Sequence, residues 1–178
     1  KTFCKPGELD RGIFSIYLFN LVHLKKGEGI FQLTGVPHAY LEGQNVEIMA
    51  NSDNVLRGGL TTKHIDVPEL LKHTKCEATY PSILSGEEIG THEKLFKTSA
   101  PDFQLSVIDL AAGDTISFTP ITTEILLLTE GMAELDDDNI EVRLGQGNPA
   151  AVAFTGQVVY LAAATRSTIF RASVPHLL

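Results

Sequence analysis

The chain has 178 residues, of which 43% are hydrophobic and 20% are charged, and its formal net charge is -8. This composition is typical of one large or two small globular domains and excludes a disordered tail. The acidic balance argues against a nucleic-acid partner, because proteins that bind phosphate backbones carry dense basic faces. No apolar run approaches the roughly 20 residues that cross a bilayer, so no membrane association is expected. Cys4 and Cys76 are too few for a disulfide framework, and we expect a reducing, cytoplasmic location.

Short strands separated by turns are predicted for the first part of the chain. The apolar run over 13–24 has the composition of a buried strand, and shorter apolar stretches follow at 30–33, 39–41 and 46–49. Glycine-containing polar turns separate these stretches. Their spacing suits a barrel or a sandwich.

One short helix is predicted after these strands. Asp66 can accept hydrogen bonds from first-turn amides, Pro68 suits a first turn, and Glu69 completes a pair that resembles a capping box. We expect this helix to end near Thr74. The polar segment 81–101 has no regular apolar period, so an irregular connector is predicted there.

From residue 103 onward the sequence again predicts strands. Eight apolar or alternating segments are separated by turns, at 103–110, 116–119, 124–129, 132–135, 140–144, 150–154, 158–163 and 168–173. Strands of this length and number are typical of an all-β sandwich or jelly roll.

A glycine-rich turn leads into His38. Gly35 permits a tight turn, and Pro37 fixes φ so that the next side chain points into the mouth of a barrel. The spacing over 27–38 resembles the second motif of the cupin superfamily, with Leu33 in place of the usual Pro. His38 is therefore a candidate metal ligand, although a single His beside a turn is more often a surface or core residue.

The run from Pro37 to Val67 carries a more specific resemblance. It reads Pro-His-Ala-Tyr-Leu-Glu-Gly, then Glu-Ile-Met-Ala-Asn-Ser-Asp-Asn-Val-Leu-Arg-Gly-Gly-Leu-Thr-Thr-Lys, then Ile-Asp-Val. This run resembles type I phosphomannose isomerases closely, and the order of elements along the whole chain agrees with that family. Thr62 stands where the family usually has Pro, a difference that would loosen Lys63 slightly.

The resemblance implies a zinc enzyme of the cupin class that interconverts mannose 6-phosphate and fructose 6-phosphate. It implies that zinc is held by a Gln, a His and a Glu from an N-terminal half, together with His38. It also implies that Arg57 is the catalytic arginine and that Lys63 is the family's substrate-binding lysine. Such an isomerisation moves a proton between C1 and C2 through an enediolate, which a Lewis acid and fixed positive charge stabilise.

The residues around His38 have alternative roles. Tyr40 would lie on the same face of a strand and bind the sugar or metal-bound water, or it is a half-buried tyrosine at a barrel rim. Arg57 suits bidentate contacts and Lys63 suits a dianionic phosphate, whereas without the resemblance both would be solvated charges. Asp53 either orients Arg57 or acts as acid or base in catalysis, or it belongs to an Asx turn.

Most of the implied zinc ligands are not found in this chain. Upstream of His38 only His23 is present, without a Gln-x-His or His-x-His pair. We therefore expect the chain alone to be inactive and to hold no stoichiometric zinc. In the C-terminal part Val159 stands where a second cupin motif would have His, which predicts a metal-free domain.

The expected fold is all-β, with two cupin or jelly-roll domains and one short helix between them. Residues 1–79 would form the C-terminal part of a catalytic cupin, incomplete at its N-terminus, with the helix; 80–100 would be the connector, and 101–178 the second domain. An incomplete barrel exposes strand edges, so we expect either a homodimer or association with the missing N-terminal half. The competing hypothesis is a non-catalytic bicupin that binds a sugar phosphate as a regulator or structural module.

Overall fold

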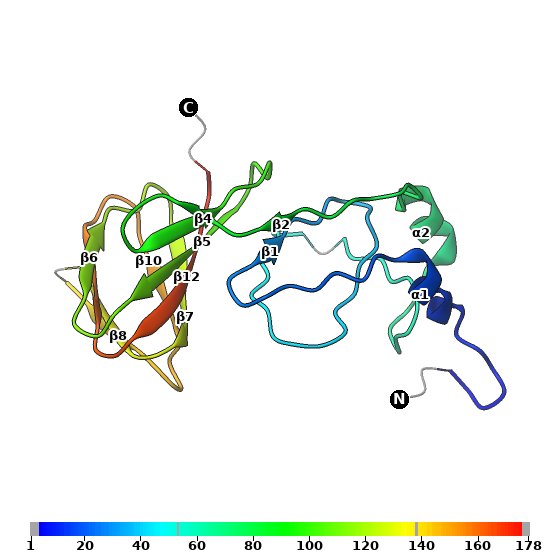
Figure 1. Ribbon diagram of the computed structural model, residues 1–178, viewed down its shortest axis with the longest axis horizontal. Coiled ribbons are helices and arrows are strands. Elements are labelled where there is room, and N and C mark those ends of the chain that lie inside the picture. Colours follow the sequence, from blue (N-terminus) through cyan, green and yellow to red (C-terminus); the bar gives the residue numbers. More distant parts are fainter. Residues whose placement is uncertain (1–3, 53, 138, 176–178) are drawn as a thin grey trace. The chain divides into compact units, whose positions relative to one another are not determined.

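Two compact units make up the chain (Figure 1). The computed structural model describes residues 4–52, 54–137 and 139–175. The first unit comprises Lys1–Lys26, Ile30–Asn45 and Asn51–Ile83, and the second comprises Gly27–Gly29, Val46–Ala50 and Leu84–Leu178. The two units therefore alternate along the sequence, and the domain bounds 1–79, 80–100 and 101–178 remain a prediction.

The first unit begins with helical turns where a strand was predicted. A 3-10 helix, η1 (Arg11–Phe14), continues into a single α-helical turn, α1 (Ser15–Leu18). Asp10 caps η1, because its side chain accepts a hydrogen bond from the backbone N–H of Gly12. The strand prediction for 13–24 was wrong because β-propensity is expressed only where a neighbouring strand supplies hydrogen bonds and packing.

Most of the chain between α1 and residue 86 consists of loops. Strand β1 (Gly29–Ile30) forms a two-stranded sheet with β2 (Ile83–Leu84). No strand covers 39–41 or 46–49, all of which the structure describes, so those two predictions were wrong. The predicted short helix is confirmed as α2 (Val67–His73), where Asp66 accepts a hydrogen bond from Glu69 N at 3.0 Å.

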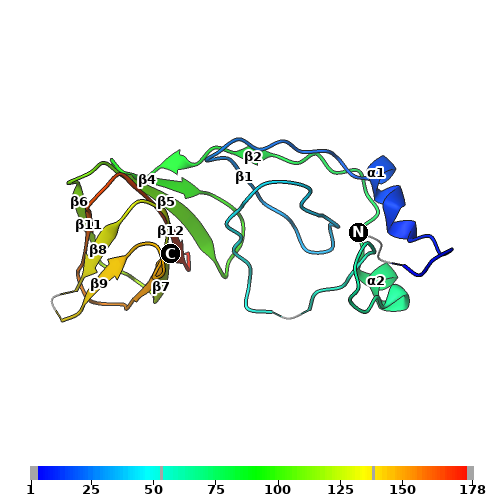
Figure 2. The ribbon, with the colours of Figure 1, turned by 90° about the horizontal axis from the view of Figure 1, so that it is seen from below.

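The second unit is a sandwich of two antiparallel sheets (Figure 2). The six-stranded sheet has the order β10-β7-β12-β5-β4-β3, and the four-stranded sheet has the order β6-β11-β8-β9. The eight strands predicted from residue 103 onward are confirmed. They are β5 (Gln104–Leu110), β6 (Thr115–Phe118), β7 (Glu124–Glu130), β8 (Ala133–Asp136), β9 (Glu141–Leu144), β10 (Ala150–Ala153), β11 (Val159–Ala163) and β12 (Ser167–Ser173).

The predicted connector contains two strands of the larger sheet. These are β3 (Glu87–Glu88) and β4 (Glu93–Phe96), and β4 pairs with β5 along its whole length. The expectation of an irregular segment over 81–101 was therefore wrong for these residues. The apolar pattern gave no signal because a charged residue, Glu93, occupies a position opposite the buried Ile108.

The hydrophobic core belongs entirely to the second unit. Its buried side chains come from both sheets and include Ile108, Leu126, Leu161 and Ile169, none of which is exposed to solvent. In the first unit, by contrast, no described residue is buried. Many of its large apolar side chains face solvent: Leu9, Ile16, Tyr17, Leu18, Leu21, Leu41, Leu71 and Tyr80 are all more than half exposed. Among the described residues, no helix has the length and apolar character needed to span a membrane.

Candidate functional site

His38 is held by a hydrogen bond that leaves one ring nitrogen available. Its Nδ1 lies 3.1 Å from the carbonyl oxygen of Val36, and the side chain is exposed. A carbonyl oxygen can only accept, so this bond requires the proton on Nδ1, and in the neutral ring the lone pair then lies on Nε2. Histidines that bind metals commonly have this arrangement, with one nitrogen donating to a backbone carbonyl.

Tyr40 lies beside His38. The two rings are in edge contact, with centroids 6.0 Å apart and an interplanar angle of 67°. Tyr40 is 61% exposed, so its ring lies at the surface of the first unit. The structure therefore brings these two predicted site residues together, although they are in a loop and not in the expected strand. Their roles in binding remain predictions.

Arg57 and Lys63 flank a loop with an unusual backbone. Arg57 is half-buried and Lys63 is exposed, and the backbone N–H of Lys63 donates to Thr61 Oγ1 at 3.1 Å. Between them, Gly59 and Leu60 have φ angles of 142° and 51°. No hydrogen bond or ion pair among the described residues joins either cation to His38. The loop nevertheless presents two positive charges in the same unit as His38.

Asp10 connects this loop to the start of the chain. One oxygen of its carboxylate accepts from Gly12 N at 2.7 Å, and the other accepts from Leu60 N at 2.8 Å. Sequence reasoning did not identify this residue. An Asp two positions before a Gly at the start of an apolar segment is a signal for a cap, but the bond to Leu60 spans 50 residues and has no local signal.

Asp53, a predicted catalytic residue, lies outside the described residues. Of the residues beside it, Asn54 donates its backbone N–H to Ser52 Oγ at 3.3 Å. The catalytic role of Asp53 stays a prediction.

The described residues do not assemble a complete zinc site. Nowhere in the described ranges do three or more His, Cys, Asp or Glu side chains lie close enough to hold a metal ion. A catalytic zinc ion normally has three protein ligands and a water. His38 has the geometry of one ligand, and the donors among the described residues do not fit the complete ion.

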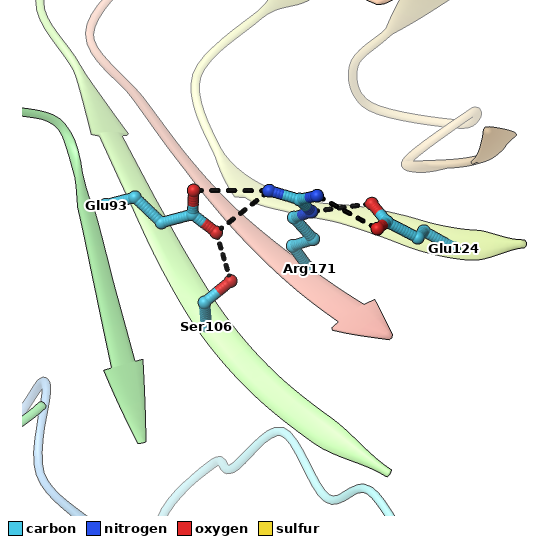
Figure 3. Close-up of polar contacts among 4 residues, drawn as sticks. All are labelled: Glu93, Ser106, Glu124 and Arg171. Atoms are coloured by element: carbon cyan, nitrogen blue, oxygen red, sulfur yellow. Dashed lines mark hydrogen bonds and ion pairs between the residues drawn. The ribbon is translucent and has the colours of Figure 1, made fainter. Parts of the chain in front are cut away.

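A polar cluster in the second unit was also missed from the sequence. Figure 3 shows Arg171 between Glu93 and Glu124, with Ser106 beside Glu93. Arg171 donates to Glu124 and Glu93, and the Ser106 hydroxyl donates to Glu93 at 2.5 Å. The guanidinium carbon also lies 4.3 Å from the centroid of the Phe118 ring. Both carboxylates are paired with the same guanidinium group. The cluster therefore contains one more negative charge than positive charges.

Comparison with known proteins gives a consistent set of relatives. No family model matches the chain. The mannose-6-phosphate isomerase of Escherichia coli is 40% identical over 145 residues, which cover 81% of this chain and 37% of that protein. Mannose-6-phosphate isomerase 1 of Arabidopsis thaliana is 36% identical over 119 residues, covering 67% of this chain and 28% of that protein. The matches thus span 37% of the length of the first of these curated relatives and 28% of the second.

A solved structure is similar over the same part. The crystal structure of mannose 6-phosphate isomerase from Salmonella typhimurium, bound to its substrate, F6P, and a zinc atom, has a TM-score of 0.57 and 31% identity. The similarity covers 71% of this chain and 32% of that protein, in its C-terminal part.

Proposed function

Because the chain is homologous to the C-terminal part of mannose-6-phosphate isomerases, we propose that the full-length protein interconverts mannose 6-phosphate and fructose 6-phosphate. The observation that supports this proposal most strongly is the sequence match with the Escherichia coli enzyme over four fifths of the chain. We further propose that the protein is cytoplasmic and that its two units derive from the cupin class.

Within this reaction, Arg57 and Lys63 supply positive charge to an anionic sugar. Lys63 is exposed and acts as a point charge for the phosphate group. Arg57 stabilises the negative charge that develops on the sugar oxygens when a proton moves between C1 and C2 through an enediolate. Tyr40 donates a hydrogen bond from its hydroxyl group to the sugar, and Asp53 orients Arg57 or transfers the proton.

Zinc is the proposed cofactor of the full-length protein, and His38 is the ligand that this chain supplies. The free Nε2 of His38 supports this role, because a metal binds the deprotonated nitrogen. The remaining ligands would come from another region of the full-length protein, which corresponds to the part of the relatives outside the match. When bound, zinc would supply Lewis acidity to the sugar oxygens.

The exposed apolar side chains of the first unit suggest what else the protein needs. Isolated apolar residues at a surface are ordinary, but a unit without any buried described residue lacks a core of its own. We propose that either the missing N-terminal half or a second copy of the chain covers them. Sedimentation of this chain as a stable monomer that binds no hydrophobic dye would contradict the proposal.

The activity is tested with the full-length protein in a coupled assay for the two sugar phosphates. We expect turnover that is lost when a chelator is added, and chelator-insensitive activity on another sugar would contradict the proposal. Arg57→Ala distinguishes an enzyme from a sugar-phosphate-binding regulator, because only the enzyme has turnover to lose. Arg143→Ala is the matched control, since Arg143 is an exposed arginine of the second unit.

A further inference from the structure

The loop between Arg57 and Lys63 has a backbone that a leucine rarely adopts. Leu60 has a φ of 51°, and among the described residues it is the one non-glycine residue with a positive φ. A side chain in this region is disfavoured by its contact with the backbone, so such a conformation persists only where neighbouring structure enforces it. The contacts that enforce it come from the start of the chain.

Two contacts fix this loop against η1. Gly59 and Gly12 meet backbone to backbone, and a Cβ atom built on Gly59 would lie 2.8 Å from the Cα atom of Gly12. Beside this contact, Asp10 accepts from Leu60 N and from Gly12 N through its two different oxygens. One carboxylate therefore satisfies both backbone donors. An asparagine in the same place has a single acceptor oxygen, and the second donor would face its amide group.

We propose that Asp10 is a positioning residue that fixes the loop carrying Arg57 and Lys63. This inference rests on the isomerase function proposed above. Leu60 lies three residues after Arg57 and three residues before Lys63, so a shift of its backbone displaces both cations. Groups that bind a substrate or stabilise its developing charge act only from a fixed position relative to it. Small displacements of these groups therefore lower the reaction rate.

Amide hydrogen exchange on the full-length protein tests whether Asp10 holds the loop. We expect Asp10→Ala to raise the exchange rate of the segment containing Leu60 at least tenfold, with no change in the core strand around Ile169. The matched control is Asp137→Ala, which also removes an acceptor of two backbone N–H groups, those of Asn139 and Ile140. Unchanged exchange around Leu60 in Asp10→Ala would overturn the inference whatever the protein catalyses.

Steady-state kinetics test whether the loop position matters for the reaction. We expect kcat/KM for mannose 6-phosphate to fall at least tenfold in Asp10→Ala through both a lower kcat and a higher KM. The kcat/KM of Asp10→Asn should lie between those of Asp10→Ala and the unmodified protein, since asparagine retains one acceptor oxygen. If Asp10→Ala does not fold, Asp10→Asn is used in its place. Asp137→Ala should stay within twofold of the unmodified protein.

The two failures can be told apart. Faster exchange around Leu60 with an unchanged kcat/KM, in a protein that Arg57→Ala inactivates, would overturn the positioning role and leave the proposed function intact. An unmodified full-length protein without isomerase activity would contradict the proposed function, and the exchange rates would still decide whether Asp10 fixes the loop.

Discussion

Arg171 donates two hydrogen bonds to Glu124, from Nε at 2.6 Å and from Nη2 at 2.9 Å. Burial by itself would lower the pKa of the Arg171 guanidinium, but the hydrogen bonds to Glu124 and the charge of Glu93 outweigh it and raise this pKa above its ordinary value. Arg171 is therefore a permanent cation inside the sandwich, and Glu124, whose side chain is 4% exposed, depends on it for charge compensation.

Replacing Arg171 by Met should destabilise the second unit strongly. The substitution would leave the carboxylates of Glu93 and Glu124 without their cation, and breaking a buried pair in this way costs about 3 kcal/mol or more of unfolding free energy. Urea denaturation followed by far-UV circular dichroism measures the change. Arg143→Met is the control, because Arg143 pairs with Glu134 and Glu141 while its side chain is 78% exposed, and we expect a loss below about 1 kcal/mol. Equal losses in the two variants would contradict this account.

Gly131→Ala should destabilise the sandwich more than Gly113→Ala. Both glycines have positive φ, at 91° and 88°, so alanine strains the backbone similarly at each, by about 1 kcal/mol. A Cβ atom at Gly131 would also collide with Arg166 O and Ser167 Oγ, whereas at Gly113 it would meet nothing within 4 Å. The difference in melting temperature between the two variants isolates the collision. If they melt together, the close approach at Gly131 is not a constraint.

The pKa of Glu69 should lie below its ordinary value of 4.5. The hydrogen bond from Lys72 is the main cause and that from His73 is the second. A carboxyl group with a lowered pKa stabilises the fold above pH 4.5, and this contribution is lost as the pH falls through the pKa of the folded state. NMR titration of the Glu69 carboxyl carbon measures it. Lys72→Ala should raise the pKa toward 4.5, whereas Lys75→Ala should leave it unchanged.

Metal analysis should find well below one zinc ion in the 178-residue chain after gel filtration. A single imidazole, that of His38, cannot hold zinc tightly against solvent. In the full-length protein we expect zinc to be retained and His38→Ala to reduce its content, while His64→Ala leaves it unchanged. One zinc ion per chain in the 178-residue protein would show that other residues complete the site.

The predictable parts of the fold were those with a local signal. The strands of the second unit alternate between buried and exposed positions, as in β8, where Ala133 and Leu135 are buried and the residues between and after them are exposed. The helix α2 was predictable because the Asp66 cap acts within one turn. The segment 13–24 alternates only at its start and then becomes a continuous apolar run, and such a run is compatible with either a strand or a helix.

The site was predictable only where residues are close in the sequence. His38 and Tyr40 are two residues apart, and their contact follows from the chain itself. The bond from Leu60 N to Asp10 spans 50 residues, and the pair formed by Arg171 and Glu93 spans 78. Such pairs are fixed by tertiary structure, and a single sequence gives no indication of which charged residue meets which.

The place of β12 has a consequence for how the protein is made. This strand follows all the others in the chain, yet it lies between β5 and β7 and pairs with both. Thr168 bonds to Asp109, 59 residues earlier. During translation the larger sheet therefore has an open slot at its centre until Ser167–Ser173 has left the ribosome. Until then the edges of β5 and β7 that face this slot are unpaired, which exposes the nascent chain to non-native strand pairing.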